Sequence, residues 1–187
     1  MTNKITNQFE ELIKAIKDNQ SIANNIDRAA TLIIDSIEGG GKLLICGNGG
    51  SAADAQHISA ELLGKYEKKR KALPAIALTT DTSMLTAWSN DDAFENVFSK
   101  QVEGLGKKDD VLLGISTSGN SENVIKALKL AKDMGLKTIS LNGKDGGRMK
   151  GMADVEILIK HNRTSRIQEV HHLVYHIICG LIEEHFS

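Results

Sequence analysis

Short apolar runs alternate with amphipathic segments along most of this chain. Five of the runs are almost continuously apolar, which is typical of strands buried on both faces of a parallel sheet; they lie at 42–46, 75–78, 111–115, 138–141 and 155–159. Helical segments follow from about Ser51, Phe94, Ser121, Gly147 and Ser165. The alternation predicts an α/β fold with a doubly wound, five-stranded parallel sheet, whose ligands bind at the carboxyl ends of the strands.

Two further amphipathic segments precede the first strand. Apolar residues recur at helical spacing over 5–19 and again over 21–38, and three glycines at 39–41 end the second segment. We therefore expect a helical hairpin at 1–40 that packs on the domain or on a partner subunit. The α/β core follows at 41–187, so that 1–187 form a single domain.

The composition argues against several classes of protein. A net charge of −1 gives no electrostatic footprint for nucleic acid, and we interpret the short basic run at 65–71 as a solvated loop. Cys46 and Cys179 both lie in apolar patterns, which favours buried thiols in a reducing compartment. Because no stretch has a signal-peptide or transmembrane pattern, we expect a cytoplasmic protein without membrane contact.

The most informative segment is the loop that follows the third apolar run. Four hydroxyl residues and a glycine fall within Ser-Thr-Ser-Gly-Asn-Ser at 116–121, between a strand and a helix. The N-terminus of a helix offers free N–H groups and a positive dipole end, which suit a phosphate. The alternative is an ordinary Ser/Asn helix cap. Four hydroxyls in six residues favour the phosphate of a monoester, since neither a Walker lysine nor a G-x-G-x-x-G pattern is present.

A second glycine loop follows the first apolar run. It reads Gly-Asn-Gly-Gly-Ser at 47–51 and leads into a helix on which His57 and Glu61, four residues apart, share one face. This pair is able to bind a divalent metal or to act as an acid and a base. The alternative is a surface ion pair of little energetic consequence, but the glycine loop just upstream favours the functional interpretation.

Three of the six histidines of the chain fall within six residues of the last helical segment. Gln168, His172 and His176 are spaced four apart and form a ridge beside an apolar stripe. Metal binding or acid–base chemistry is at least as good an explanation of this ridge as a polar face is. For His171 we favour the polar face.

Taken together and in order, these motifs resemble the phosphoheptose isomerase family of the sugar isomerase (SIS) group. The resemblance is carried by G-N-G-G-S-x-x-D-A-x-H-x-x-x-E from 47, N-D at 90, L-L-G-I-S-T-S-G-N-S-x-N-V from 112, G-K-D-G-G from 143 and R-I-Q-E-x-H-x-x-x-x-H from 166. It implies conversion of sedoheptulose 7-phosphate to D-glycero-D-manno-heptose 7-phosphate, the first step of bacterial heptose synthesis. It also implies a homotetramer whose active sites are shared between subunits.

The resemblance also assigns roles to individual residues. The phosphate would be held by Ser116, Thr117, Ser118 and Ser121, and the sugar by Asn48, Gly49, Gly50, Ser51, Asn90 and Asp91, with Glu61 and Gln168 also in contact. One zinc ion per subunit would be bound by His57, Glu61, Gln168 and His176. Glu61 and His176 would be the catalytic acid–base pair.

The sequence departs from the family pattern at a few positions. Many relatives have aspartate where Ser165 stands, arginine where Lys65 stands, and a small residue with glycine where Trp88 and Ser89 stand. A different class of function is a non-catalytic SIS scaffold that binds a replication initiator protein. The His/Glu/Gln/His set distinguishes the two and favours the enzyme.

Overall fold

A single parallel sheet forms the centre of the molecule. The computed structural model describes residues 2–187 and orders the strands β2-β1-β3-β4-β5, all parallel. The strands are β1 (Leu43–Gly47), β2 (Ala75–Ala77), β3 (Val111–Ser116), β4 (Lys137–Gly143) and β5 (Val155–Ile159). The predicted doubly wound five-stranded fold is therefore confirmed, and the strand bounds agree to within two residues.

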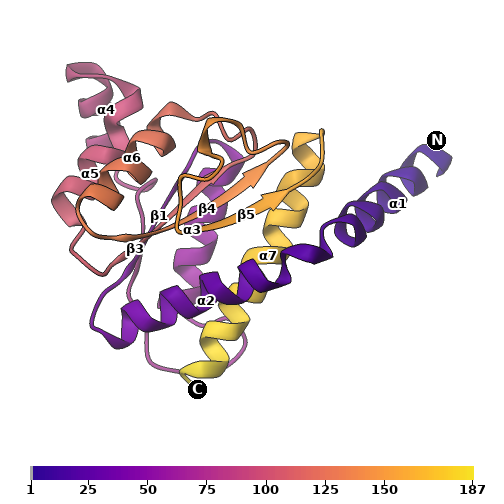
Figure 1. Cartoon of the computed structure of the whole chain (residues 1–187), viewed down its shortest axis with the longest axis horizontal. Helices are drawn as coiled ribbons and strands as arrows, with labels where there is room; N and C mark the ends of the chain where they lie inside the picture. The colour runs from indigo at the N-terminus through magenta and orange to yellow at the C-terminus, as the bar shows by residue number, and fades with distance from the viewer. Residues whose placement is uncertain (1) are drawn as a thin grey trace.

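Helices cover both faces of this sheet (Figure 1). They are α1 (Thr2–Asp18), α2 (Ala23–Glu38), α3 (Gly50–Leu63), α4 (Thr82–Asp91), α5 (Val97–Leu105), α6 (Glu122–Asp133) and α7 (Thr164–His185), with single turns η1 (Gln20–Ile22), η2 (Phe94–Asn96) and η3 (Gly147–Met149). Successive strand residues point to opposite faces, so the strands feed two cores. One core includes Leu113 and residues of α2, α3 and α7, and the other includes Leu112 and residues of α5 and α6.

The two N-terminal helices exist as predicted, but they do not form a hairpin. They follow one another across turn η1 instead of folding back side by side (Figure 1). Asn19 fixes this junction, because its amide donates to the Ala15 carbonyl at 2.8 Å and its oxygen accepts from Lys160 N–H at 2.8 Å. The hairpin prediction was wrong because the junction depends on the contact between Asn19 and Lys160. These two residues are 141 positions apart in the sequence, so local periodicity does not reveal the contact.

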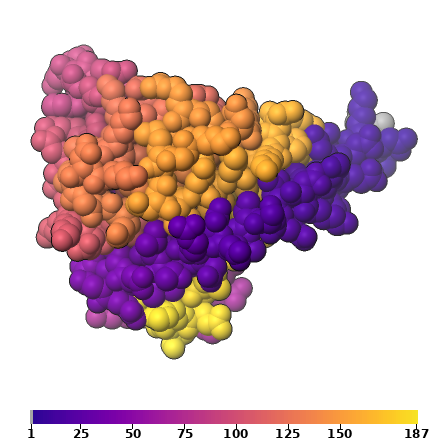
Figure 2. All heavy atoms as spheres, in the orientation of Figure 1, coloured from indigo at the N-terminus to yellow at the C-terminus, as the bar shows by residue number. Residues whose placement is uncertain are grey.

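Helix α1 leaves much of its surface without a partner in the chain. Figure 2 shows its N-terminal part standing clear of the rest of the molecule. Ala15 is the single buried residue among those described in α1, whereas Ile5, Phe9 and Ile13 are 51–65% exposed. Exposed apolar patches of this kind often mark protein interaction surfaces.

Two other local predictions need correction. Residues 82–91 form α4, which the sequence pattern did not indicate; Asp81 caps it by accepting from Met84 N–H at 2.9 Å. The helix expected from Gly147 is only the turn η3, because Gly146 and Gly147 have φ values of +90° and +52°. Such left-handed backbone does not continue into an α-helix.

The expectation that both cysteines are buried thiols is confirmed. Cys46 and Cys179 are both buried and unpaired in the described chain. Burial raises the pKa of each thiol to about 12, so neither is a reactive thiolate. Separately, none of the helices within residues 2–187 has the length and apolarity needed to span a membrane.

Candidate active site

The loop between β3 and α6 brings hydroxyl groups together at the carboxyl end of the sheet. Ser116 Oγ lies 2.8 Å from Ser121 Oγ and 3.4 Å from Ser118 Oγ. Ser121 is the N-cap residue of α6, yet its hydroxyl accepts no capping bond from the described backbone. The helix-cap alternative therefore does not explain this serine. A group of hydroxyls at a helix N-terminus is suited to a phosphate.

A second loop, which follows β4, packs against the hydroxyl loop. Gly119 has a φ of +65°, and a Cβ there would lie 1.9 Å from the Gly146 carbonyl oxygen. Met149 N–H donates to the Gly119 carbonyl at 2.9 Å, and Arg148 N–H donates to Asn120 Oδ1 at 3.1 Å. The Gly-Lys-Asp-Gly-Gly motif thus shapes the loop, which requires glycine at the contact.

An amide pair ties the hydroxyl loop to the glycine loop after β1. Asn48 Nδ2 donates to Asn123 Oδ1 at 2.8 Å, and Asn123 Nδ2 donates back to Asn48 Oδ1 at 2.8 Å. Asn123 is only 3% exposed and lies in the first turn of α6. Sequence reasoning missed this residue, although an asparagine two positions after the serine loop was a signal for it.

The glycine loop also lets α7 approach the start of α3. Gly49 has a φ of +56°, and a Cβ on Gly50 would lie 2.2 Å from Gln168 Nε2. A cavity of about 480 Å³ opens at this contact, lined in part by Gly50, Gln168, Asp54 and His172. Gln168 therefore borders the glycine loop, as the resemblance implies for a sugar contact, while Ser51 lies buried beside it.

Farther along α3 and α7, three imidazoles face one another. The ring centroids of His57, His172 and His176 are 5.0–5.2 Å apart, and their ligand nitrogens all lie within 4.8 Å of one another. Glu61 Oε1 is 3.0 Å from His57 Nε2. This set of imidazole and carboxylate donors could hold a transition-metal ion such as zinc. We call these four residues the histidine cluster.

Two buried polar groups contact the outer side of the histidine cluster. The hydroxyl of Tyr175, which is 1% exposed, lies 3.0 Å from His57 Nδ1. Asp54 Oδ1 lies 3.7 Å from His172 Nδ1, and Asp54 Oδ2 is buried without a hydrogen-bond partner in the described chain. Neither Tyr175 nor Asp54 was identified as functional from the sequence.

The environment keeps these groups in forms suited to metal binding and proton transfer. Burial, with further lowering by neighbouring histidines, holds the pKa of His176 and of His172 below the ordinary value of 6.5. Both imidazoles are therefore neutral at pH 7. Burial raises the pKa of Asp54 to about 6, although the nearby His57 opposes this shift. Shifted pKa values of this kind are common at catalytic sites.

Comparison with known proteins accounts for this combination of loops and side chains. Residues 5–143 match the model of the SIS domain family. The chain is 54% identical to a phosphoheptose isomerase of Helicobacter pylori (strain P12), over 91% of this chain and 89% of that protein. The chain belongs to the phosphoheptose isomerase family. Solved phosphoheptose isomerases from Neisseria gonorrhoeae and Francisella tularensis superimpose with TM-scores of 0.93 and 0.94, at 46% and 40% identity, each covering 98% of both chains.

Family membership decides between the two functional classes considered above. The relatives named here are isomerases, and this chain has His57, Glu61, Gln168 and His176 together. The alternative of a non-catalytic scaffold is therefore not supported.

One pair of expected sugar ligands lies apart from the rest in a single chain. Asn90 and Asp91 are exposed at the end of α4, where the Asn90 amide donates to Asp91 Oδ1 at 2.9 Å. Helix α4 projects at an outer corner of the molecule, away from α7 (Figure 1). The structure thus does not bring this pair to the histidine cluster of its own chain.

His171 is a core residue and not part of a polar face. It is 0% exposed, and its Nε2 donates to the Asn142 carbonyl at 3.0 Å. Burial lowers its pKa to about 4, so the ring stays neutral. The assignment to a polar face was wrong, because His171 lies four residues after Ile167 and four before Tyr175, both of which are buried.

Of the positions that depart from the family pattern, Ser165 borders the cavity beside Gly50, whereas Lys65 and Trp88 do not line it. Ser165 is exposed and lines the same cavity as Gln168, and Lys65 is exposed in the loop after α3. Lys100 Nζ lies 5.0 Å from the centre of the Trp88 ring, so this tryptophan makes a cation–π contact between α4 and α5.

The basic run at 65–71 is not simply a solvated loop, because the side chain of Arg70 is buried. Its guanidinium donates to the carbonyls of Glu61 and Leu62, each at 2.7 Å, and its Nε lies 3.5 Å from Glu183 Oε1. Glu183 is 2% exposed and accepts from the backbone N–H groups of residues 66–68 at 2.7–2.8 Å. This anchor holds the loop against α7, beside Glu61.

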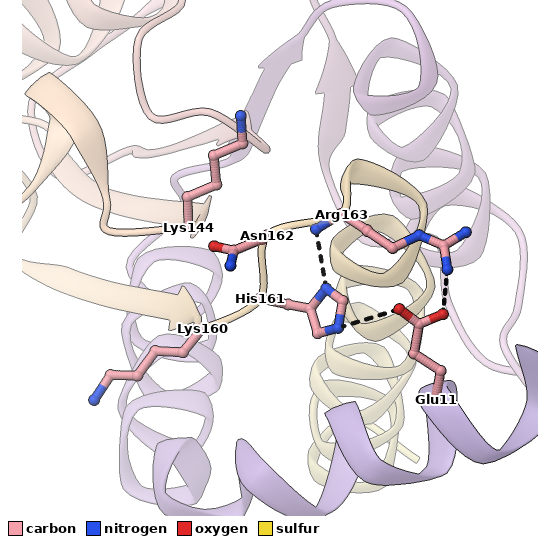
Figure 3. Close-up of a pocket in the computed structure, with 6 residues that line it drawn as sticks. All are labelled: Glu11, Lys144, Lys160, His161, Asn162 and Arg163. Carbon is pink, nitrogen blue, oxygen red and sulfur yellow. Dashed lines mark hydrogen bonds and ion pairs between the residues drawn. The ribbon is translucent and has the colours of Figure 1, made fainter.

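A separate basic pocket opens at the ends of β4 and β5 (Figure 3). Its volume is about 550 Å³, and it is lined by Glu11, Lys144, Lys160, His161, Asn162 and Arg163. Arg163 and His161 both pair with Glu11, while the Lys144 and Lys160 side chains point away from each other (Figure 3). The cations do not converge on one point, and none of the expected site residues lines this pocket.

Proposed function

We propose that this protein converts sedoheptulose 7-phosphate to D-glycero-D-manno-heptose 7-phosphate, the first step of bacterial heptose synthesis. The main observation in support is the connection between two loops. The hydroxyl loop, which suits a phosphate, is joined through Asn123 and Asn48 to the glycine loop, and α3 runs from the glycine loop to Glu61. His57 lies seven residues along α3 from Gly50, which is roughly 10 Å of helix. An extended seven-carbon sugar phosphate has a comparable length. The free buried cysteines are in keeping with a cytoplasmic enzyme.

The proposed substrate orientation follows from the order of these elements. Ser116, Thr117, Ser118 and Ser121 bind the phosphate, and binding energy there fixes the far end of the sugar. Along the sugar we propose contacts from Asn48, Gly49, Gly50, Ser51, Glu61 and Gln168. The reactive carbons C1 and C2 then lie at the histidine cluster.

The reaction moves a proton between C1 and C2 by way of an enediol. It needs one group that takes a proton from carbon and another that manages the protons on the two oxygens. Glu61 and His176 fill these two roles, and the neutral imidazole of His176 is able to accept a proton at pH 7. The division of the two roles between them stays open.

We propose that zinc binds at the histidine cluster. Of the four ligands implied by the resemblance, His57, Glu61 and His176 lie together there, whereas the Gln168 amide packs on Gly50. A bound ion would supply a Lewis acid for the substrate oxygen. The protein residues would hold the substrate carbons beside Glu61 and His176.

We further propose a homotetramer with shared active sites. Leu173 and Ile177 are about two-fifths exposed and lie next to His172 and His176 on α7. They border an apolar cavity of about 360 Å³ at the junction of α1 and α2. The exposed stripe of α1 from a second copy is of matching character, and Asn90 and Asp91 of one subunit would complete the site of another.

The test is incubation of the metal-loaded enzyme with sedoheptulose 7-phosphate, with the aldose detected by NMR. Glu61→Gln and His176→Gln should each reduce turnover by about 10²–10⁴-fold while the circular dichroism spectrum stays unchanged. Glu184→Gln, an exposed neighbour on α7, is the matched control and should keep full activity. Absence of aldose from the wild-type enzyme, or normal turnover by either site variant, would refute the assignment.

A further inference from the structure

His171 is the only fully buried histidine within residues 2–187, and the proposed reaction does not use it. Its ring faces β4, on the side of α7 that packs against the sheet. We propose that His171 is a positioning residue for the substrate phosphate: it fixes the end of β4, and the end of β4 fixes the hydroxyl loop at 116–121. This inference rests on the phosphate site of the proposed function, but neither on the identity of the sugar nor on the metal.

The first argument is the place of the hydrogen bond that His171 makes. Its Nε2 donates at 3.0 Å to the carbonyl of Asn142, the last residue but one of β4. That carbonyl belongs to the peptide unit that joins Asn142 to Gly143. Because a peptide unit is planar, the bond also fixes the orientation of the Gly143 N–H group. The imidazole on α7 therefore controls the direction in which the chain leaves the sheet.

The second argument is the close packing between the end of β4 and the hydroxyl loop. Asn142 pairs in register with Ser116, the first hydroxyl residue of the loop. A Cβ on Gly143 would lie 2.4 Å from the Thr117 carbonyl oxygen and 2.6 Å from Ile167 Cγ2. Gly143 thus lies between the hydroxyl loop and α7, with no room for a side chain. A shift of its peptide unit would move Ser116 and Thr117 directly.

The turn after β4 makes a further contact with the hydroxyl loop. Gly146 N–H donates to the Gly143 carbonyl at 3.0 Å and closes this turn. The Gly146 carbonyl then reaches Gly119, where a Cβ would lie only 1.9 Å from its oxygen. The hydroxyl loop is therefore in contact, at Thr117 and at Gly119, with a segment that begins at the peptide unit bonded to His171.

The third argument is that packing alone does not explain an imidazole at this position. His171 is 0% exposed, and its Nδ1 has no hydrogen-bond partner in the described chain. Burying such an atom costs free energy, and an apolar side chain would fill the same space without that cost. The bond to the Asn142 carbonyl is the polar contact that the imidazole gains in return. Binding sites need such supports, because their groups must be held to within about 0.5 Å.

The experiment measures phosphate binding and turnover in the full-length protein. His171→Phe keeps a ring but removes the donor. It should weaken binding of inorganic phosphate in calorimetry, and raise KM for sedoheptulose 7-phosphate, by about 10-fold, the factor that one hydrogen bond typically supplies. Its kcat should stay near the wild-type value, because the loss falls on binding remote from the reacting carbons. His171→Gln, whose amide is able to donate to the same carbonyl, should restore most of the affinity.

Thr138→Val is the matched control, since it removes a buried hydrogen bond at the opposite end of the same strand. Thr138 is also 0% exposed, and its hydroxyl donates to Asp154 Oδ2 at 2.8 Å. This variant should lose stability in urea and yet keep wild-type phosphate affinity and KM. Gly143→Ala is a second test, because its Cβ would press on the Thr117 carbonyl and should weaken phosphate binding too.

The outcomes separate this inference from the proposed function. Wild-type phosphate affinity in His171→Phe beside a loss in Ser121→Ala, or equal losses in His171→Phe and Thr138→Val, would overturn the positioning role and leave the function standing. If His171→Phe does not fold, normal affinity in Gly143→Ala would overturn it instead. Phosphate binding that depends on both His171 and Ser121, in a protein that makes no aldose, would uphold the positioning role and refute the function. A wild type that binds no phosphate would refute both.

Discussion

The anchor between Glu183 and the loop after α3 predicts that replacing one oxygen by an amide nitrogen is costly. Glu183 Oε1 accepts from Tyr66 N–H, and Oε2 accepts from Glu67 and Lys68 N–H groups, at 2.7–2.8 Å. In Glu183→Gln the amide NH₂ must face at least one of these donors in either orientation. The change therefore leaves a buried N–H group without an acceptor, and Arg70 without its counter-charge.

The magnitude follows from these two losses. The Arg70 and Glu183 side chains are only 2% and 3% exposed. Breaking a buried ion pair by removing one partner typically costs about 3–5 kcal/mol. Hydrogen bonds to charged groups contribute about 1.5–3 kcal/mol each. Loss of the bonds that the loop N–H groups donate to Glu183 therefore leads to an estimate of the same size. We expect Glu183→Gln to lose about 3–5 kcal/mol from a typical total of 5–15 kcal/mol.

Urea denaturation at fixed protein concentration measures this loss, because the proposed assembly would couple stability to concentration. Glu184→Gln is the control, since Glu184 is the exposed neighbour of Glu183 and its substitution should change stability little. A loss below about 1 kcal/mol in Glu183→Gln would refute the reasoning, because that is the level of an exposed ion pair.

The anchor also has a pH signature. Burial by itself raises the pKa of the Glu183 carboxyl, but the backbone donors of the loop and Arg70 outweigh it and hold the pKa below the ordinary 4.5. A lowered carboxyl pKa contributes stability that is present above the unfolded value and is lost as the pH falls through the folded value. The wild type should therefore lose more stability below pH 4.5 than Glu183→Gln does.

Three further predictions concern other parts of the molecule. Ser121→Ala should weaken binding of the phosphorylated sugar, measured by calorimetry, and leave zinc binding intact; equal affinity for sedoheptulose with and without phosphate would contradict this. His171 should contribute stability above pH 6.5 that is lost as the pH falls toward 4, up to about 3 kcal/mol, so urea midpoints of His171→Gln should depend less on pH in that window. Phe9→Asp, on the exposed stripe of α1, should dissociate the proposed tetramer in sedimentation experiments, whereas Glu10→Gln should not.

The sheet was predictable because each strand is a nearly unbroken apolar run, and such runs are buried from both sides. Helix α4 was not, because its Ser, Thr and Asn residues are poor helix formers and none of its residues is buried. Its one local signal was Asp81 at the N-cap. The course of α1 and α2 depends on Asn19 and the distant Lys160, which a reading of local periodicity does not detect.

The site was predictable to the level of helix faces but not of single ligands. Spacing by four placed Gln168, His172 and His176 on one ridge, and nothing in that spacing says which of them turn toward α3. The residues that contact the histidine cluster from behind could not be predicted for a similar reason. Tyr175 and Asp54 lie on positions that face another helix, so their roles depend on how α3 and α7 pack.

In the proposed function, helix α7 links catalysis to stability and to assembly. Its 22 residues carry Gln168 at the cavity beside Gly50, the imidazoles in the middle, and, near its end, Glu183, which anchors the loop after α3. The exposed Leu173 and Ile177 alternate with the two imidazoles, so a subunit that buries these apolar residues also covers His172 and His176. Covering the cluster would remove water from the proposed place of enediol formation, and a lower dielectric would strengthen every charge interaction there. Assembly of a second copy on this face would therefore raise the rate of the chemical step as well as the stability of the fold.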